Sequence, residues 1–182
     1  MNNVEWTPEW LTETIKLLRT HGSDTQFIEV KKAHGGYPKS LDATLSSFSN
    51  SSTGGIIICG LDENNDFAPV GVYNPAALEQ SLGNKLRNGL KPPNTMESGT
   101  ILYEGAKIFV ATIPPLPLHE RPAYIRGKAY VRSGDGDHEM SRHETDLMMA
   151  QRTRTGFDEE PVAYTSVANL DKDLKKAYLK EV

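Results

Sequence analysis

Three carboxylates and two lysines of this sequence could form a chemical site. Glu29 and Lys31 stand two apart in a stretch, residues 26–33, that alternates as a strand does, so they share one face. A lysine can hold a phosphate and a glutamate a divalent metal ion, although a solvated strand edge is the plain alternative for Glu29, Lys31 and Lys32. Asp24 precedes this stretch and Asp62 follows a later buried strand. Together with Glu29 they could form an acidic metal cluster if the fold brings them together.

A glycine-rich segment, residues 49–55, is a second candidate site. Its backbone amides could cradle an anion, with Asn50, Gly54 and Gly55 as the contacts. It is not a P-loop, because no Gly-Lys-Ser follows and the next element is a strand. The pattern favours the alternative, a tight turn that needs glycine for its backbone angles.

Basic residues gather further along the chain. Arg121, Arg126, Lys128 and Arg132 flank or occupy a predicted hairpin, and residues 121–154 hold seven bases and five acids. Arginine suits bidentate contact with phosphate. The alternative is an ordinary charged hairpin.

The overall charge limits what these bases can mean. The 182 residues carry 20 Lys and Arg against 24 Asp and Glu, a net charge of −4, and the isoelectric point is about 5.7. A uniformly basic nucleic-acid binder is therefore excluded, but a local basic patch is not. The five histidines form no HxH or HExxH pattern, and nothing marks a catalytic nucleophile.

The sequence predicts a cytoplasmic protein without a membrane segment. Its one cysteine, Cys59, cannot form an internal disulfide, which favours a reducing compartment. The first ten residues lack the basic and apolar regions of a signal peptide. The longest apolar run, residues 56–61, is far short of the ~20 residues that a membrane helix needs.

Helices and strands alternate along the chain and would position these residues. A capped start at Thr7-Pro8, the stripe of Leu41, Leu45 and Phe48, and a capping box at Ser141 indicate helices. We expect helices over 8–20, 38–49, 75–88 and 142–154. We expect strands over 26–33, 56–61, 69–72, 100–104, 107–113, 123–126 and 128–132, with the fourth and fifth joined at Gly105-Ala106 and the last two at Gly127. Residues 133–137 are expected to form a turn.

Several short motifs in this order resemble the Schlafen AlbA_2 family. They are FIEVK at 27–31, SSFSN at 46–50 with Gly54-Gly55, IIICGLD at 56–62, PVG at 69–71, AYIRG at 123–127 and YVRSG at 130–134. Each motif alone is weak, whereas their order and spacing are fairly specific. The likeness covers residues 26 to about 151.

The resemblance implies an α+β fold with a mixed β-sheet and flanking helices. It also implies a domain that binds nucleic acid, DNA rather than RNA, at the N-terminus of a multidomain transcriptional regulator and without a cofactor. The contacts it implies are Lys31, Lys32, Asn50, Gly54, Gly55, Arg126 and Arg132.

Two alternatives stay open beside DNA binding. Some relatives of this family cleave RNA with three acids, and Asp24, Glu29 and Asp62 stand at matching positions. Glu29 and Asp62 would then hold Mg²⁺ or Mn²⁺ near a phosphate. The other alternative is a regulatory or assembly domain without catalysis, and a homo-oligomer stays open in every case.

The chain divides into three predicted segments. Residues 1–25 form an N-terminal helix and lead-in, and residues 26–154 the AlbA_2-like domain. Residues 155–182, with six acids and four bases, form a linker and terminal helix leading to C-terminal domains that this chain lacks.

Overall fold

The computed structural model describes residues 6–157. The chain divides into two units after Arg152, and the account below concerns the first. The α-helices are α1 (Pro8–His21), α2 (Leu41–Asn50), α3 (Pro75–Asn84) and α4 (Arg142–Phe157). The strands are β1 (Ile28–Lys31), β2 (Gly55–Cys59), β3 (Leu61–Asp62), β4 (Ala68–Pro69), β5 (Leu90–Lys91), β6 (Glu97–Tyr103), β7 (Ala106–Ile113), β8 (Tyr124–Ile125), β9 (Lys128–Ser133) and β10 (Gly136–Glu139). Three short turns are η1 (Glu63–Asn65), the π-helix η2 (Lys85–Gly89) and η3 (Leu118–Glu120).

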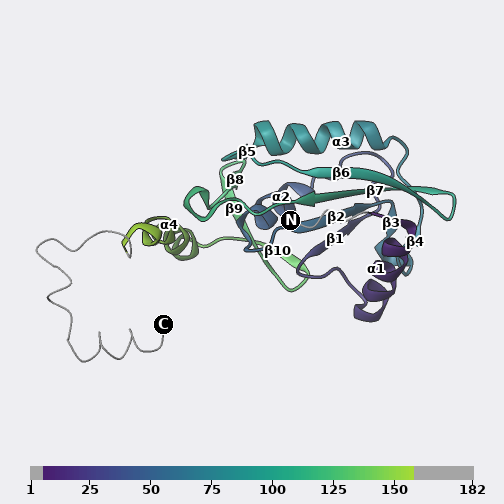
Figure 1. The fold of residues 1–182 in the computed structure, drawn as a ribbon, viewed down its shortest axis with the longest axis horizontal. Coiled ribbons are helices and arrows are strands. Elements are labelled where there is room, and N and C mark those ends of the chain that lie inside the picture. Colours follow the sequence, from purple (N-terminus) through teal and green to yellow (C-terminus); the bar gives the residue numbers. More distant parts are fainter. Residues whose placement is uncertain (1–5, 158–182) are drawn as a thin grey trace, which may run out of the picture. The chain divides into compact units, whose positions relative to one another are not determined.

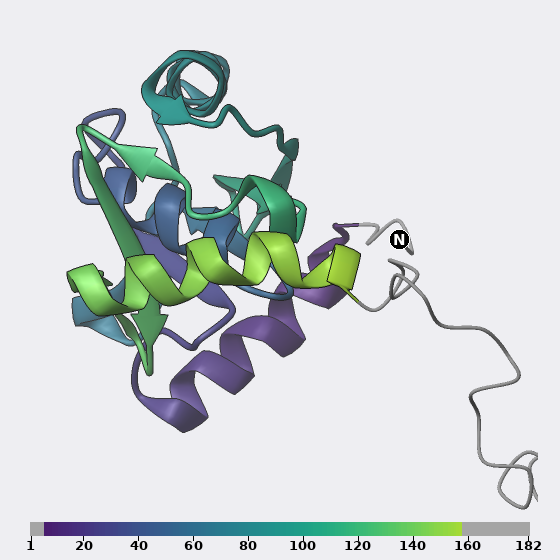
Figure 2. The ribbon, with the colours of Figure 1, turned by 90° about the vertical axis from the view of Figure 1, so that its left-hand side faces the viewer.

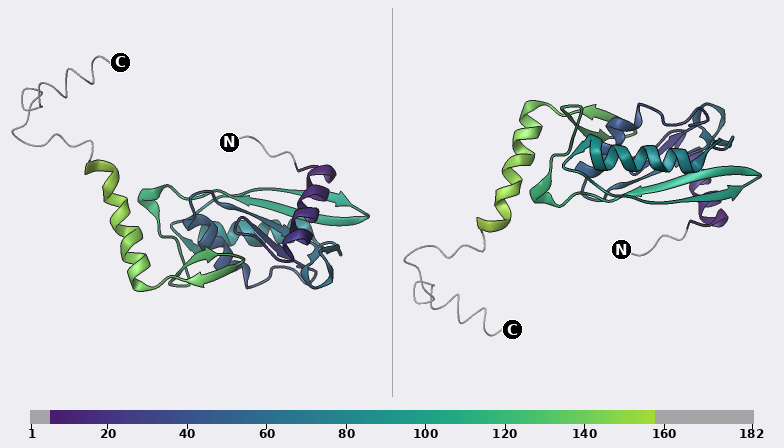
Figure 3. Two further views of the ribbon diagram at one scale, coloured as in Figure 1. Left: turned by 90° about the horizontal axis from the view of Figure 1, so that it is seen from below. Right: turned by 90° about the horizontal axis from the view of Figure 1, so that it is seen from above.

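The main sheet has the order β1-β2-β7-β6 (Figure 1). Strand β1 runs parallel to β2, with Glu29 opposite Ile57. Strands β2 and β7, and β7 and β6, are antiparallel, and the β6–β7 hairpin is long in both views of Figure 3. The sheet is therefore mixed, and the predicted α+β fold is confirmed.

Helices cover both faces of this sheet. Leu11, Ile15 and Leu18 of α1 share one apolar cluster with Val30 and Ile58. The other face packs against α2 and α3 through a second cluster, which includes Leu41, Leu45, Phe48, Ile57, Cys59, Leu78, Leu82, Leu86 and Phe109. Figure 2 shows α1 and α3 on opposite sides of the molecule. Successive residues of β2 divide between the clusters, since side chains of a strand alternate.

A second antiparallel sheet, β10-β9-β8-β5, packs against α2. The Ser46 hydroxyl donates to the Ala123 carbonyl at 2.8 Å and accepts from the Tyr130 amide at 3.0 Å. Asn50 lies one turn further on, and its side chain bonds to backbone groups of both Ala123 and Tyr130. Polar residues on α2 are therefore buried, because they bind the backbone of this sheet.

The structure corrects several predicted boundaries. The apolar run from residue 56 ends as a strand at Cys59, because Gly60 has a φ of +109°. The helix expected from residue 38 begins at Leu41. The helix expected over 75–88 changes to a π-helix at Lys85, and the hairpin of β6 and β7 turns at Glu104-Gly105.

Two strands were not expected at all. Strand β5 falls in a predicted break, and β10 begins at Gly136, within the predicted turn at 133–137, which is observed at Gly134 and Asp135. Among the described residues, no helix is long and apolar enough to cross a membrane. The segment predicted as a linker and terminal helix lies, from residue 158, outside the described residues.

Candidate functional site

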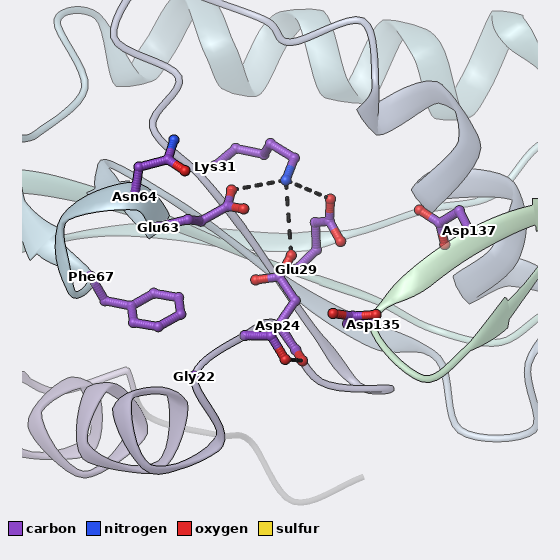
Figure 4. Close-up of a pocket in the computed structure, with 10 residues that line it drawn as sticks. Gly22, Asp24, Glu29, Lys31, Glu63, Asn64, Phe67, Asp135 and Asp137 are labelled. Carbon is purple, nitrogen blue, oxygen red and sulfur yellow. Dashed lines mark hydrogen bonds and ion pairs between the residues drawn. The ribbon is translucent and has the colours of Figure 1, made fainter.

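A polar pocket of about 360 Å³ opens beside strand β1 (Figure 4). The parallel pairing of β1 with β2 places Glu29 and Lys31 on one face, as the alternation predicts. The lining residues come from the α1–β1 loop, β1, the turn after β3, and β10 with its preceding turn. They are Gly22, Ser23, Asp24, Glu29, Lys31, Glu63, Asn64, Phe67, Asp135 and Asp137.

The Lys31 ammonium lies between three carboxylates of this pocket (Figure 4). Its Nζ is 3.0 Å from Glu29 Oε1, 2.9 Å from Glu63 Oε1 and 3.8 Å from Asp24 Oδ2. The Asp24 carboxylate is fixed from its other oxygen, which accepts a hydrogen bond from the Val30 amide at 3.0 Å. Glu29 and Lys31 thus bind each other and their neighbours in the pocket.

Arg132 of β9 lies behind the pocket lining, where it binds two of the pocket carboxylates, and its side chain is only 2% exposed. The guanidinium NH1 lies 2.7 Å from Glu29 Oε2 and 3.2 Å from Asp137 Oδ1. The same group donates to the carbonyls of Thr25 and Ile28. Arg132 thereby links the second sheet to the start of β1.

Helix α2 also contributes to these contacts, because two of its hydroxyl groups bind Asp137. Thr44 Oγ1 donates to Asp137 Oδ2 at 2.7 Å, and Ser47 Oγ donates to Asp137 Oδ1 at 2.5 Å. The Arg132 guanidinium lies over the ring of Phe48, 5.3 Å from its centroid. Such a stack adds to the ion pairs, because a cation is attracted to the face of an aromatic ring.

The pocket perturbs the protonation of its own groups. Burial, together with the charges of Glu29 and Glu63, raises the pKa of Asp24 from 3.8 to about 8. Burial alone would lower the pKa of Lys31, but its bonds to Glu63 and Glu29 outweigh burial and raise it. The same balance of burial against Glu29 and Asp137 raises the pKa of Arg132. Near neutral pH both cations are therefore charged, and the Asp24 carboxyl holds its proton to a higher pH than an ordinary aspartate does.

A divalent metal ion does not fit the pocket in this arrangement. The Lys31 ammonium takes the position between Asp24, Glu29 and Glu63 that such an ion would need. Within residues 6–157, no group of three or more His, Cys, Asp or Glu side chains is arranged to hold a metal ion. Burial raises the pKa of the Cys59 thiol to about 12, so this sulfur is not a nucleophile at neutral pH.

The structure brings Asp24 and Glu29 together but places Asp62 elsewhere. Asp62 Oδ2 pairs with Lys32 Nζ at 2.6 Å, and Oδ1 caps the turn η1. Its neighbour Glu63 lines the pocket instead. Sequence reasoning missed Glu63, although it is adjacent to the candidate, and it missed Asp135 and Asp137 because their segment carried no strand pattern.

The residues of the glycine-rich segment have structural contacts. Asn50 is 4% exposed and bonds to the second sheet, as described above. A Cβ on Gly54 would lie 2.2 Å from the Ile113 carbonyl oxygen, and one on Gly55 would lie 2.5 Å from the Phe48 ring. Both glycines are buried, so the tight-turn alternative accounts for them.

Arg126 lies outside the pocket, at the tip of the β8–β9 hairpin, with its side chain 64% exposed. Its NH2 atom pairs with Asp42 Oδ2 at 2.7 Å. Asp42 also binds Lys85, at 3.4 Å, and accepts a 2.7 Å hydrogen bond from the Tyr37 hydroxyl. Lys32, the other exposed candidate, is paired with Asp62.

The fold and its buried ion pairs define a small α+β domain of known type. Residues 24–141, more than half of the chain, match the family described as Schlafen, AlbA_2, and the chain belongs to this family. No curated protein matches the chain in sequence.

The comparison with solved structures found two that resemble this chain. One is the N-terminal domain of a RecG-related protein from Nitrosomonas europaea, with 22% identity, a TM-score of 0.56, and coverage of 76% of this chain and 97% of that one. The other is the DIP2311 protein from Corynebacterium diphtheriae, with 15% identity and a TM-score of 0.49, covering 80% of this chain and 28% of that one. At 22% identity the likeness to the Nitrosomonas europaea domain concerns the fold alone.

Proposed function

We propose that this AlbA_2 domain binds nucleic acid, DNA in preference to RNA, as the N-terminal module of a multidomain transcriptional regulator. One observation carries the proposal, which is a local concentration of bases in a chain of net charge −4. Residues 85–91 contain three bases and no acid, and residues 121–132 contain four bases and no acid. Strand β5 pairs with β8, with Lys91 opposite Tyr124, and so joins the two segments.

The proposed phosphate contacts are the exposed bases around this pairing. The side chains of Arg126 and Lys128 are 64% and 53% exposed. Arg87 and Lys91 are exposed too, and neither has an ion-pair partner among the residues that the structure describes. Lys31 and Arg132 are excluded, because both are paired inside the acidic pocket, and Asn50, Gly54 and Gly55 are excluded because they are buried. Lys32 stays a candidate beside the pocket.

Fluorescence anisotropy with labelled oligonucleotides tests the proposal. Binding to DNA should weaken as salt rises, because each neutralised phosphate contributes about −0.9 to the slope of log K against log salt. RNA of the same sequence should bind less tightly. Absence of binding to every probe at about 50 mM salt, where electrostatic binding is strong, would contradict the proposal. It would favour a regulatory or assembly domain.

A metal-dependent nuclease is the second candidate, favoured by the meeting of Asp24 and Glu29 in one pocket. It requires Lys31 to leave its position between the carboxylates. Incubation of labelled tRNA and single strands with Mn²⁺ tests it, and cleavage that survives Glu29→Ala would reject Glu29 as a catalytic residue.

A further inference from the structure

A polar groove follows helix α3 on the surface of the domain, and no sequence motif pointed to it. One hollow of about 310 Å³ lies at the start of α3, where Tyr37, Tyr73 and Ser81 are among its lining residues. A second hollow of about 650 Å³ lies at the end of α3, with Ser81, Asn84 and Arg87 in its lining. Ser81 lines both hollows, so they adjoin at this residue. We call the surface formed by Tyr37, Tyr73, Ser81, Asn84, Lys85 and Arg87 the α3 surface.

An aromatic side chain stands exposed at one end of the α3 surface. Tyr73 is 85% exposed, the highest value among the exposed large hydrophobic side chains of the described residues. Burial of an aromatic ring is favourable, so a ring left in water is available for a ligand. Leu78 and Leu82 of α3 point into the core, which fixes the helix beside Tyr73.

Cations continue from this ring along the groove. Lys85 Nζ lies 5.6 Å from the centroid of the Tyr37 ring, which lines the same hollow as Tyr73. Lys85 shares Asp42 with Arg126, and Arg87 follows in the second hollow. Glu79, the acid of α3, is bound by the Ser98 hydroxyl at 2.6 Å, on the side of strand β6.

We propose that the α3 surface binds single-stranded nucleic acid, with an unpaired base stacked on Tyr73 and the phosphates following Lys85, Arg87 and Arg126. The inference rests on the proposed function and adds that the bound nucleic acid is single-stranded. A positively charged groove with an aromatic platform is the arrangement by which proteins bind single strands, since every base has a face that can stack. In a duplex the bases are already stacked on one another, so Tyr73 would have no partner.

The experiment compares three labelled 12-nucleotide probes in the full chain by anisotropy: single-stranded DNA, single-stranded RNA and duplex DNA. Both single-stranded probes should bind more tightly than the duplex. Comparison of the single-stranded DNA with the single-stranded RNA shows which of the two the protein prefers. Tyr73→Ala should weaken strand binding by about 5- to 100-fold, the loss of one base stack. Tyr73→Phe should keep wild-type affinity, because it keeps the ring.

Two controls make the result specific. An abasic strand of the same length should bind wild type and Tyr73→Ala equally, because it offers no base to stack. Arg87→Gln/Arg126→Gln should lower the salt slope by about 2, whereas Lys16→Gln/Lys107→Gln removes the same charge elsewhere and should leave it unchanged.

The outcomes separate this inference from the proposed function. If wild type binds the probes but Tyr73→Ala matches it, or if the loss persists on the abasic strand, the inference is wrong and nucleic-acid binding stands. Equal losses for the two double variants would also reject the α3 surface. If wild type binds no probe, the proposed function itself fails.

Discussion

The ion pairs of the acidic pocket and those beside the α3 surface differ in how far their cations are buried. In the pocket both partners are buried: the side chains of Arg132 and Lys31 are 2% and 21% exposed, and that of Glu29, which binds both, is 7% exposed. Beside α3 the carboxylate lies deep: Asp42 is 9% exposed, while Arg126 is 64% exposed. A pair with both partners buried therefore presents little charge to a ligand, whereas a buried carboxylate with an exposed cation presents a positive surface.

This difference explains how a chain of net charge −4 can offer a basic surface. Charges that neutralise one another in the interior contribute to the total but little to the field at the surface. Four substitutions test the comparison, in order of decreasing expected effect.

Arg132→Met should have the largest effect, on stability. It removes the partner of buried Glu29 and Asp137, and breaking a buried pair from one side typically costs ~3–5 kcal/mol. Urea unfolding at pH 7 measures the loss. Arg126→Met is the matched control and should cost less than about 1 kcal/mol, because its side chain is exposed. Equal losses in the free energy of unfolding for the two variants would contradict the difference in burial between Arg132 and Arg126.

Asp42→Asn should have opposite effects on stability and binding. The amide can still accept the Tyr37 hydrogen bond, but it loses the charge that holds Lys85 and Arg126, at a cost of about 1–2 kcal/mol. The freed cations should strengthen oligonucleotide binding several-fold, measured by anisotropy. Weaker binding by the folded variant would show that Asp42 positions these cations for the ligand.

The pH dependence of stability should reveal the buried Asp24. Its folded pKa of about 8 lies above the ordinary 3.8, so the folded state holds the proton more tightly between these values. The unfolded state then binds fewer protons, and the free energy of unfolding falls as pH rises through this window. Asp24→Asn keeps an acceptor for the Val30 amide and should flatten this fall, measured by urea unfolding at pH 5, 6, 7 and 8. An unchanged slope would place the titration on another group.

Lys128→Gln should have the smallest effect. This exposed residue pairs with Glu139 at the surface, at 2.5 Å, and such pairs add little stability. The melting temperature should stay unchanged, while the slope of log K against log salt falls by about 1. Lys107→Gln serves as the control and should leave both quantities unchanged. A large loss of melting temperature would show that the hairpin depends on this pair.

The apolar pattern of the sequence predicted most of the fold. The stripe of Leu41, Leu45 and Phe48 and the capped start at Thr7 correspond to α2 and α1, because these signals act within a few residues. Strands β5 and β10 carry no such pattern. They exist through pairing with β8 and β9, which depends on contacts far along the chain.

The candidate site was predictable only in part for a related reason. Alternation placed Glu29 beside Lys31, but whether Asp62 or Glu63 faces the pocket depends on a single 3₁₀ turn. The burial of Arg132 depends on Thr25 and Ile28, more than 100 residues earlier. Tyr73 carried no signal, because an aromatic residue becomes informative only when the fold leaves it in solvent.

The buried thiol of Cys59 makes this chain well suited to chemical probing. It is the one cysteine of the sequence, it is fully buried, and its raised pKa keeps it unreactive. A cysteine introduced on the surface would therefore be the single site of maleimide or disulfide chemistry, without prior removal of a native thiol. Tyr73→Cys and Leu102→Cys, at exposed positions on different elements, would each carry one cross-linker or spin label and could map a bound strand directly.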